Sequence, residues 1–291
     1  MSDKTWVVDS HLHLFKKATA DYPRDCASFY PAEREALVDD FIEVMAVNNV
    51  RHAVIVPLGT ETRYLIEILK AFPEKFSGIA VLDYKSQNPG EDIHRWKDEI
   101  GIKGIRIMGE IGDPSTTRFE DLALAQLLRE MASLDLILWF YGSLEQLKLI
   151  HLVARALPEM TIVLNHLGFC QQGFSVDGFN RPHIEVKLPP QSVEIVEALA
   201  EFKNINVKFS GEYGFSHEKF PFLDIKPIAA RILDSFGPSR MLWASDWPWI
   251  EVNPGYESLI ALTDIYFGGI SDFDRQEIMG GNAQRLLKLK S

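Results

Sequence analysis

The sequence predicts an α/β fold, a closed (β/α)8 barrel of the TIM-barrel type that forms a single domain over residues 1–291. Segments rich in Val, Ile and Leu alternate with helical segments along the whole chain, and a length of 291 residues suits one such barrel. Connections from helix to strand are short, whereas several from strand to helix are long. An open doubly wound sheet is the alternative, but none of the expected strands looks polar enough for an edge. No strand is followed by a glycine-rich phosphate-binding sequence, which argues against dinucleotide binding.

Apolar runs and helical periodicity place the individual elements. The first strand is expected within residues 7–15, where β-branched residues have polar neighbours on both sides. Pro31 is expected to open the first helix, which ends at Asn48 and Asn49. The other strands are expected, in chain order, at residues 53–57, 78–83, 104–107, 136–140, 161–167, 205–210 and 241–245. The helices that follow them are expected at about residues 65–72, 93–100, 119–134, 144–157, 191–202, 227–236 and 255–267, with a final helical segment over 272–289.

Three long connections mark one face of the predicted barrel. They follow the first, sixth and seventh strands and cover residues 15–30, 168–190 and 211–226. Long loops in a compact domain tend to be functional, and barrel enzymes place their active sites at the carboxyl ends of the strands. We therefore expect the functional site on this face.

Composition limits the classes of partner. The formal net charge of −11 argues against non-specific nucleic-acid binding, which needs a basic surface. No apolar run approaches the length of a membrane span, and no signal peptide is evident at the start of the chain. Two cysteines, Cys26 and Cys170, suit a reducing compartment. We expect a cytoplasmic protein that acts on a small molecule, with no nucleic-acid or membrane partner; a homo-oligomer remains open.

Four polar side chains stand at the ends of the expected strands. His11 and His13 are two positions apart on the first strand and therefore project to the same side. His166 ends the sixth strand, and Asp246 follows the eighth. The first and last strands of a closed barrel are neighbours, so these four groups are expected to converge. Imidazole and carboxylate groups can bind a divalent metal or act beside a reacting carbonyl group.

Four motifs together resemble the amidohydrolase superfamily. They are the opening His11-x-His13, the strand end at 166–168 (His-Leu-Gly), the sequence Ser-Asp-Trp-Pro at 245–248, and Gly-Gly-Asn-Ala at 280–283. The resemblance extends from residue 9 to about residue 289. It is closest to the lactonase branch, which includes 2-pyrone-4,6-dicarboxylate lactonase and the sugar-acid lactonases.

This resemblance implies a (β/α)8 barrel that hydrolyses a cyclic ester, and we expect the lactone of a small acidic or sugar-acid compound. It implies that Asp246 is the general base that activates water. The carbonyl group would be polarised by His11, His13 and His166 or by one bound metal ion.

The same residues leave the metal question open. Metal-rich members of the superfamily use a carboxylated lysine or a glutamate on the fourth strand and a histidine on the fifth. This chain has Arg106 and the segment 139–141 (Trp-Phe-Tyr) at those places, which argues against a two-metal site. One Zn²⁺ or Mn²⁺ on His11, His13 and Asp246, with or without His166, and metal-free catalysis are both compatible with the sequence.

Several residues near the strand ends are candidates for contact with the substrate. Arg106 is the best candidate for binding an anion, because a guanidinium group meets a carboxylate through two hydrogen bonds. The other candidates are Tyr141, Arg181, His183, Lys208 and Trp249.

Two other functions compete with a lactonase. One is a metal-dependent decarboxylase of the same superfamily, which would release CO₂ from an aromatic or unsaturated acid. The other is a barrel that binds a ligand without turnover, although buried polar groups without a use would cost stability.

Overall fold

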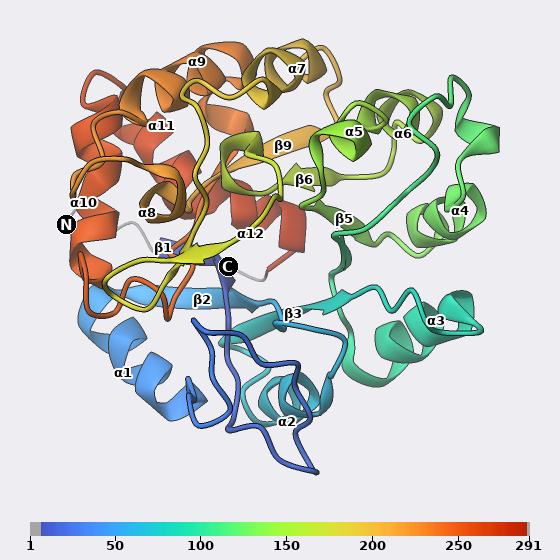
Figure 1. The fold of residues 1–291 in the computed structure, drawn as a ribbon, viewed down its shortest axis with the longest axis horizontal. Coiled ribbons are helices and arrows are strands. Elements are labelled where there is room, and N and C mark those ends of the chain that lie inside the picture. The colour runs from blue at the N-terminus through green and yellow to red at the C-terminus, as the bar shows by residue number, and fades with distance from the viewer. Residues whose placement is uncertain (1–6, 290–291) are drawn as a thin grey trace.

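The computed structural model describes residues 7–289, in which eight parallel strands form a nearly closed barrel with helices around it (Figure 1). The strands follow one another in chain order around the barrel, apart from a small hairpin inserted between the sixth and seventh. In order they are β1 (Val7–Leu12), β2 (Val50–Ile55), β3 (Phe76–Val81), β4 (Gly104–Ile107), β5 (Ile137–Phe140), β6 (Ile162–Leu164), β9 (Ile205–Phe209) and β10 (Met241–Trp243). The predicted (β/α)8 barrel is confirmed.

The helices largely follow the predicted order, but several differ in extent. They are α1 (Val38–Asn48), α2 (Arg63–Ala71), α3 (Pro89–Ile100), α4 (Ala125–Ser133), α5 (Leu144–Leu147), α6 (Ile150–Ala156), α7 (Ser192–Leu199), α8 (Glu212–Phe215), α9 (Lys226–Phe236), α10 (Tyr256–Phe267), α11 (Asp272–Gln276) and α12 (Asn282–Leu287). The first helix begins at Val38 and not at Pro31, because residues 31–37 form turns and a bridge to the segment after β1. The expected final helix is divided by a wider π-helical turn at Glu277–Gly281.

Side-chain and main-chain hydrogen bonds join the first strand of the barrel, β1, to the last, β10, and to the segment that follows it. The amide of Asp246 donates to the carbonyl of His11 at 3.0 Å, and the amide of His13 donates to the carbonyl of Trp247 at 2.8 Å. The buried carboxylate of Asp9 accepts hydrogen bonds from the amide and hydroxyl groups of Ser245. These contacts fix the start of the chain against its last strand, and they bring the polar residues of both segments together.

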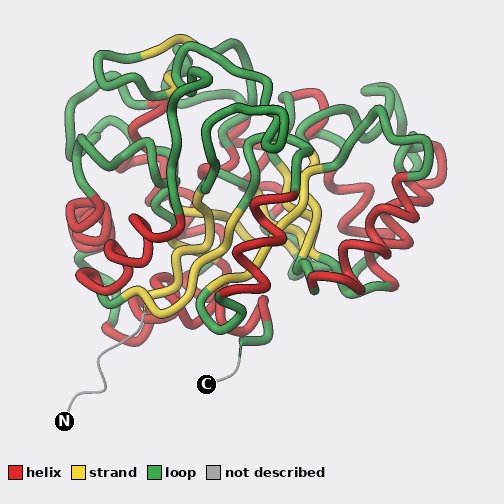
Figure 2. Tube along the Cα trace, turned by 90° about the horizontal axis from the view of Figure 1, so that it is seen from below, coloured by secondary structure: helices red, strands yellow, loops and turns green. Residues whose placement is uncertain are grey.

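Two clusters of buried apolar side chains stabilise the barrel. The larger lies between the strands and the surrounding helices. The smaller one fills the barrel interior, and it combines residues of the strands with Ala283 and Leu287 of α12. Alternation along each strand explains the division, since neighbouring positions such as Leu138 and Trp139 of β5 belong to different clusters. Figure 2 shows that long loops gather at one end of the strands.

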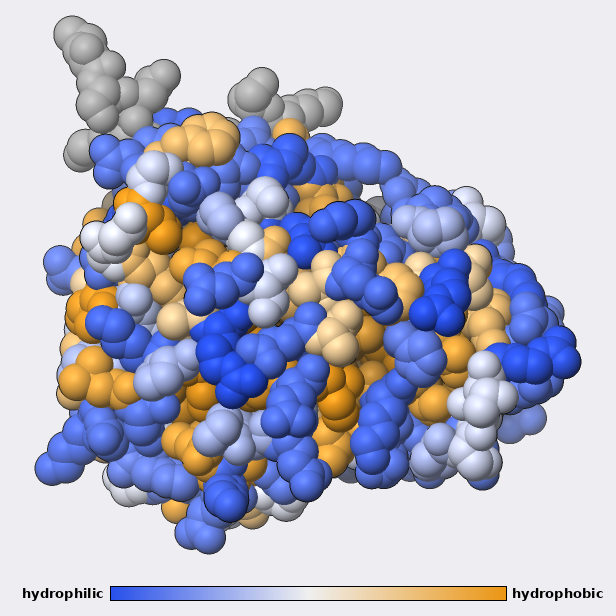
Figure 3. Space-filling view, turned by 90° about the horizontal axis from the view of Figure 1, so that it is seen from above, coloured by the Kyte–Doolittle hydropathy of each residue, from blue (hydrophilic) through white to orange (hydrophobic). Residues whose placement is uncertain are grey.

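The outer surface is mixed in character. On the face drawn in Figure 3, hydrophilic side chains border the apolar ones. Among the described residues, no helix is both long and apolar enough to cross a membrane.

Candidate active site at the carboxyl ends of the strands

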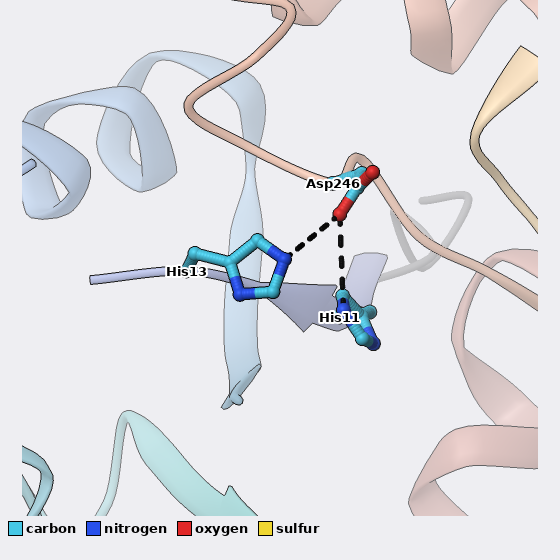
Figure 4. A group of neighbouring side chains, drawn as sticks. All are labelled: His11, His13 and Asp246. Atoms are coloured by element: carbon cyan, nitrogen blue, oxygen red, sulfur yellow. Dashed lines mark ion pairs between the residues drawn. The ribbon is translucent and has the colours of Figure 1, made fainter. Parts of the chain in front are cut away.

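His11, His13 and Asp246 lie together where β1 meets the segment after β10 (Figure 4). Asp246 Oδ1 is 3.2 Å from His13 Nε2 and 3.7 Å from His11 Nε2. One ligand atom from each residue lies within 4.8 Å of the others, and all three side chains are buried. The structure therefore places next to one another three of the four residues for which the sequence predicted convergence.

The backbone at two of the strand ends adopts an uncommon conformation. Asp246 has a φ of 58° and His166 a φ of 50°, in the left-handed region that residues other than glycine rarely occupy. Such conformations cost about 1–3 kcal/mol each and occur often at functional sites. Here they direct the carboxylate of Asp246 and the imidazole of His166 toward the same cavity.

His166 lies across this cavity from β1, in a short turn after β6. Its Nδ1 is 3.1 Å from the hydroxyl oxygen of Ser210. Burial lowers the pKa of His166 to about 4, with nearby Arg106 adding to the effect and Asp246 opposing it. The imidazole is therefore neutral near pH 7. A hydroxyl group can donate to Nδ1, and a neutral His166 would then carry its proton on Nε2.

The two oxygens of Asp246 have different surroundings. Oδ2 accepts a hydrogen bond from the hydroxyl of Tyr213 at 2.7 Å, whereas Oδ1 is buried and has no hydrogen-bond partner among the described residues. Burial by itself would raise the pKa of Asp246, but His166, His13 and Tyr213 hold this pKa below its usual range. The group is thus a carboxylate with one oxygen available for another contact.

His11 in β1 and His13, one residue after the strand, differ in the partner of Nδ1. His13 Nδ1 lies 2.7 Å from the carbonyl oxygen of Val56, which can only accept, so this nitrogen carries a proton. His11 Nδ1 instead lies 2.7 Å from Lys208 Nζ and 3.2 Å from Trp139 Nε1. The indole N–H can only donate, so Nδ1 of His11 must offer its lone pair.

This difference decides how well the group fits a metal ion. By distance, His11, His13 and Asp246 could hold one. A histidine that binds a metal through Nε2 normally donates its Nδ1 proton to an acceptor, and His13 meets that requirement. His11 does not, because donors surround its Nδ1 and its proton then belongs on Nε2. The three residues therefore do not fit a three-ligand metal site.

A cavity of about 160 Å³ opens above these groups. Its polar lining consists of His13, Arg106, Tyr141, His166, Gln171, Tyr213 and Asp246. Aromatic rings of Phe29, Phe174, Phe215 and Trp249 contribute to its walls. A larger cavity of about 770 Å³ lies beside it and shares Tyr30, Leu58, Met108 and Gln171 with it.

Arg106 gives the cavity a positive group. The side chain is buried at 6% exposure, and its Nε has no hydrogen-bond partner within residues 7–289. Its guanidinium carbon lies 5.5 Å from the centre of the Tyr141 ring. An unpaired buried guanidinium is costly, so Arg106 is a candidate for contact with an anion.

Three of the residues predicted to contact the substrate do not line this cavity. Arg181 pairs with Asp177 at 2.7 Å and donates to a main-chain carbonyl. His183 belongs to the small hairpin of β7 (Ser175–Val176) and β8 (Pro182–His183), while Lys208 lies fully buried behind His11. Arg106, Tyr141 and Trp249 do line it.

Sequence reasoning did not single out Tyr213 or Trp139. Tyr213 lies two positions after Gly211, at the start of a long connection on the predicted functional face, which was the available signal. Trp139 is two positions before Tyr141 on β5, so alternation indicates that both rings face the barrel interior. The sequence gives no signal for the hydrogen-bond partner of the Trp139 indole N–H.

Comparison with known proteins agrees with this architecture. Residues 8–289 match the protein family described as "Amidohydrolase". An L-fucono-1,5-lactonase from Burkholderia ambifaria is 24% identical over 251 residues, covering 84% of this chain and 81% of the relative.

Two solved structures share the fold. A probable 2-pyrone-4,6-dicarboxylic acid hydrolase from Acinetobacter baumannii with bound citric acid has a TM-score of 0.72 at 21% identity, covering 97% of this chain and 99% of that one. An amidohydrolase from Burkholderia multivorans with bound zinc has a TM-score of 0.72 at 19% identity, covering 98% and 100%. Because the family description spans nearly the whole chain, the protein belongs to the amidohydrolase family, as its sequence motifs predicted.

Proposed function

We propose that the protein hydrolyses a small lactone that carries a carboxylate, with Asp246 as the general base and without a metal ion. The observation that carries this proposal is the position of Asp246 Oδ1, which has no nearer polar neighbour than His13 Nε2 at 3.2 Å and lies in the same cavity as the unpaired guanidinium of Arg106. The first supplies a base for water, and the second a partner for a substrate anion. The lactonase activity named for the relative from Burkholderia ambifaria supports the reaction class.

The proposed reaction has two steps. Water attacks the lactone carbonyl carbon while Asp246 Oδ1 takes one of its protons, and the carbonyl oxygen becomes an oxyanion. His166 lines the cavity, and its Nε2–H is the group that would donate a hydrogen bond to this oxygen. The ring C–O bond then breaks, and the proton on Asp246 passes to the departing ring oxygen. The products are a hydroxyl group and a carboxylic acid, which releases a proton to the solvent.

The cavity limits the substrate that we propose. A volume of about 160 Å³ suits a small ring, and Arg106 and Tyr141 favour a carboxylate on that ring. Trp249 is placed to pack against one face of it. The solved relative that binds citric acid offers a parallel, since citric acid also carries carboxylates.

The proton positions of His11 and His13 support catalysis without a metal. One relative of known structure binds zinc. In this chain the donors around His11 Nδ1 oppose coordination through Nε2. His13 Nε2 and Asp246 Oδ1 instead form a direct ion pair when His13 carries a second proton.

The wider setting is also a proposal. We infer a single domain over residues 1–291, supported by the family match over residues 8–289 and by the one barrel that residues 7–289 build. We infer a cytoplasmic location from Cys26 and Cys170, which are both free thiols.

A panel of lactones with and without a carboxylate, together with aromatic acids, tests the function. Proton release and CO₂ are recorded before and after dialysis against a chelator. We expect proton release from acidic lactones that survives chelation, and no CO₂. The Asp246→Asn variant should keep the fold by circular dichroism and lose about 10²–10⁴-fold in kcat.

Other outcomes would contradict specific parts of the proposal. CO₂ release that depends on a metal would establish the decarboxylase. Activity lost on chelation and restored by Zn²⁺ or Mn²⁺ would refute the metal-free mechanism. An Asp246→Asn variant with most of its activity would remove the proposed base.

A further inference from the structure

We propose that Trp139 and Lys208 together fix the proton of His11 on Nε2, which makes His11 a positioning residue for Asp246 and not a metal ligand. The inference deepens the proposed function and rests on it only for its effect on turnover. The proton position itself follows from the contacts of His11.

The barrel interior brings the two partners under His11. Trp139 of β5 and Lys208 of β9 both point inward, because their neighbours Leu138 and Phe209 belong to the outer core. Lys208 Nζ lies 3.8 Å from the centre of the Trp139 ring, so the two side chains pack against each other. Both are fully buried, as is His11, which leaves none of them free to turn toward solvent.

Trp139 supplies the decisive contact. Its Nε1–H has no acceptor role, and its partner at 3.2 Å is His11 Nδ1. A proton on Nδ1 would face the indole proton directly, and the buried indole N–H would lose its hydrogen bond. Lys208 Nζ at 2.7 Å offers further N–H groups to the same nitrogen. A neutral His11 therefore keeps its lone pair on Nδ1 and its proton on Nε2.

The opposite side of the ring faces Asp246. His11 Nε2 is buried without a hydrogen-bond partner among the described residues and lies 3.7 Å from Asp246 Oδ1. His11 does not line the cavity, whereas Asp246 does. The Nε2–H thus faces the carboxylate from below at 3.7 Å, where it attracts Oδ1 electrostatically without forming a hydrogen bond and leaves Oδ1 able to accept a proton from water.

The arrangement also opposes metal binding. Coordination through Nε2 would require the His11 proton to move to Nδ1, against the indole N–H of Trp139. Lys208 Nζ occupies the other approach to His11 Nδ1, 2.7 Å away. Trp139 and Lys208 are in this way specificity residues that keep His11 and His13 free of metal.

Long-range ¹H–¹⁵N NMR of the histidine rings tests the proton position in the unaltered protein. The signals of His11 are assigned by their loss in the His11→Gln variant. We expect Nε2 of His11 to be protonated and Nδ1 to show the shift of an unprotonated nitrogen. A proton on Nδ1 would overturn the proposal, whether or not any lactone is hydrolysed.

The Trp139→Phe variant tests the effect on metal binding. It removes the indole N–H and keeps an aromatic ring beside Lys208. Zinc binding is measured by calorimetry and is assigned to this site by its loss on His13→Gln. We expect Trp139→Phe to raise zinc affinity about tenfold or more.

Trp96→Phe is the matched control, because the indole of Trp96 is buried in α3 and belongs to the outer core. It should leave zinc affinity unchanged. Equal zinc affinity in the unaltered protein and in Trp139→Phe would overturn the proposal. Because both measurements are made without substrate, failure of the lactone assay and failure of this inference remain distinguishable.

Discussion

Arg106 is the residue whose surroundings bear most directly on the proposed substrate. Buried arginines usually meet a carboxylate of the same chain, yet Arg106 Nε has no hydrogen-bond partner in the part of the chain that the structure describes. The guanidinium lies in the same cavity as Asp246, so a bound anion would sit close to the proposed base.

An Arg106→Gln change should separate acidic from neutral substrates. Hydrogen bonds to charged groups contribute about 1.5–3 kcal/mol, so we expect kcat/KM for an acidic lactone to fall about 10–100-fold. A neutral lactone should be affected much less. Arg95→Gln, at an exposed arginine of α3, is the matched control. Equal losses on both kinds of lactone would show that Arg106 is structural.

At the residue scale, the sequence predicted which side chains meet but not how they are protonated. The period of two along β1, together with closure of the barrel, was enough to bring His11 and His13 to Asp246. Lys208 was expected to contact the substrate, but it lies behind His11 in the barrel interior. How far a side chain lies below the mouth of the barrel is set by packing, which a single sequence does not reveal.

Among the elements, the turn between β9 and α8 controls how closely the His166 ring can approach. Gly211 in this turn has a φ of 80°, and a Cβ atom there would lie 2.6 Å from His166 Nδ1. Neither the conformation nor the distance tolerates a side chain. The ring therefore occupies space that exists only because residue 211 is glycine.

Gly211→Ala should displace His166 and weaken the fold locally. We expect the free energy of unfolding to fall by roughly 1–3 kcal/mol and kcat to fall with it. Thermal unfolding and lactone turnover measure the two effects. Gly173→Ala is the control, since a Cβ atom at Gly173 would meet nothing within 4 Å. Similar behaviour of both variants would contradict the close approach of His166.

Long periodic elements were predictable, and short ones were not. The apolar runs of the eight barrel strands stood out because they are repeated and rich in β-branched residues. The hairpin of β7 and β8 has only two residues in each strand, which is too short for any periodicity. The π-helical turn at Glu277–Gly281 interrupts a segment whose apolar spacing reads as one helix.

For the molecule as a whole, the free energy of unfolding should depend on pH partly through the titration of one buried carboxyl group. Glu212 of α8 is 3% exposed, and burial raises its pKa to about 8. In the unfolded chain the same group has an ordinary pKa of 4.5. Between these values the folded state holds a proton that the unfolded state has released. The contribution of protonated Glu212 to the free energy of unfolding is therefore complete below pH 4.5 and is lost as the pH rises through 8.

A Glu212→Gln variant should remove this dependence. Relative to the unaltered protein, its free energy of unfolding should rise by roughly 3–5 kcal/mol between pH 5 and pH 9. Urea unfolding at several pH values gives this difference directly. Glu218→Gln, at an exposed glutamate six positions further along the same connection, should show no such trend. A constant difference for Glu212→Gln would refute a buried, protonated Glu212.

The joining of β1 to the segment after β10 has a consequence for biosynthesis. His11 leaves the ribosome early, but the carboxylate that it meets is encoded some 235 codons later, and the helix that fills the barrel interior comes later still. Translation that stops before Asp246 would yield a polypeptide with both imidazoles and without the proposed general base.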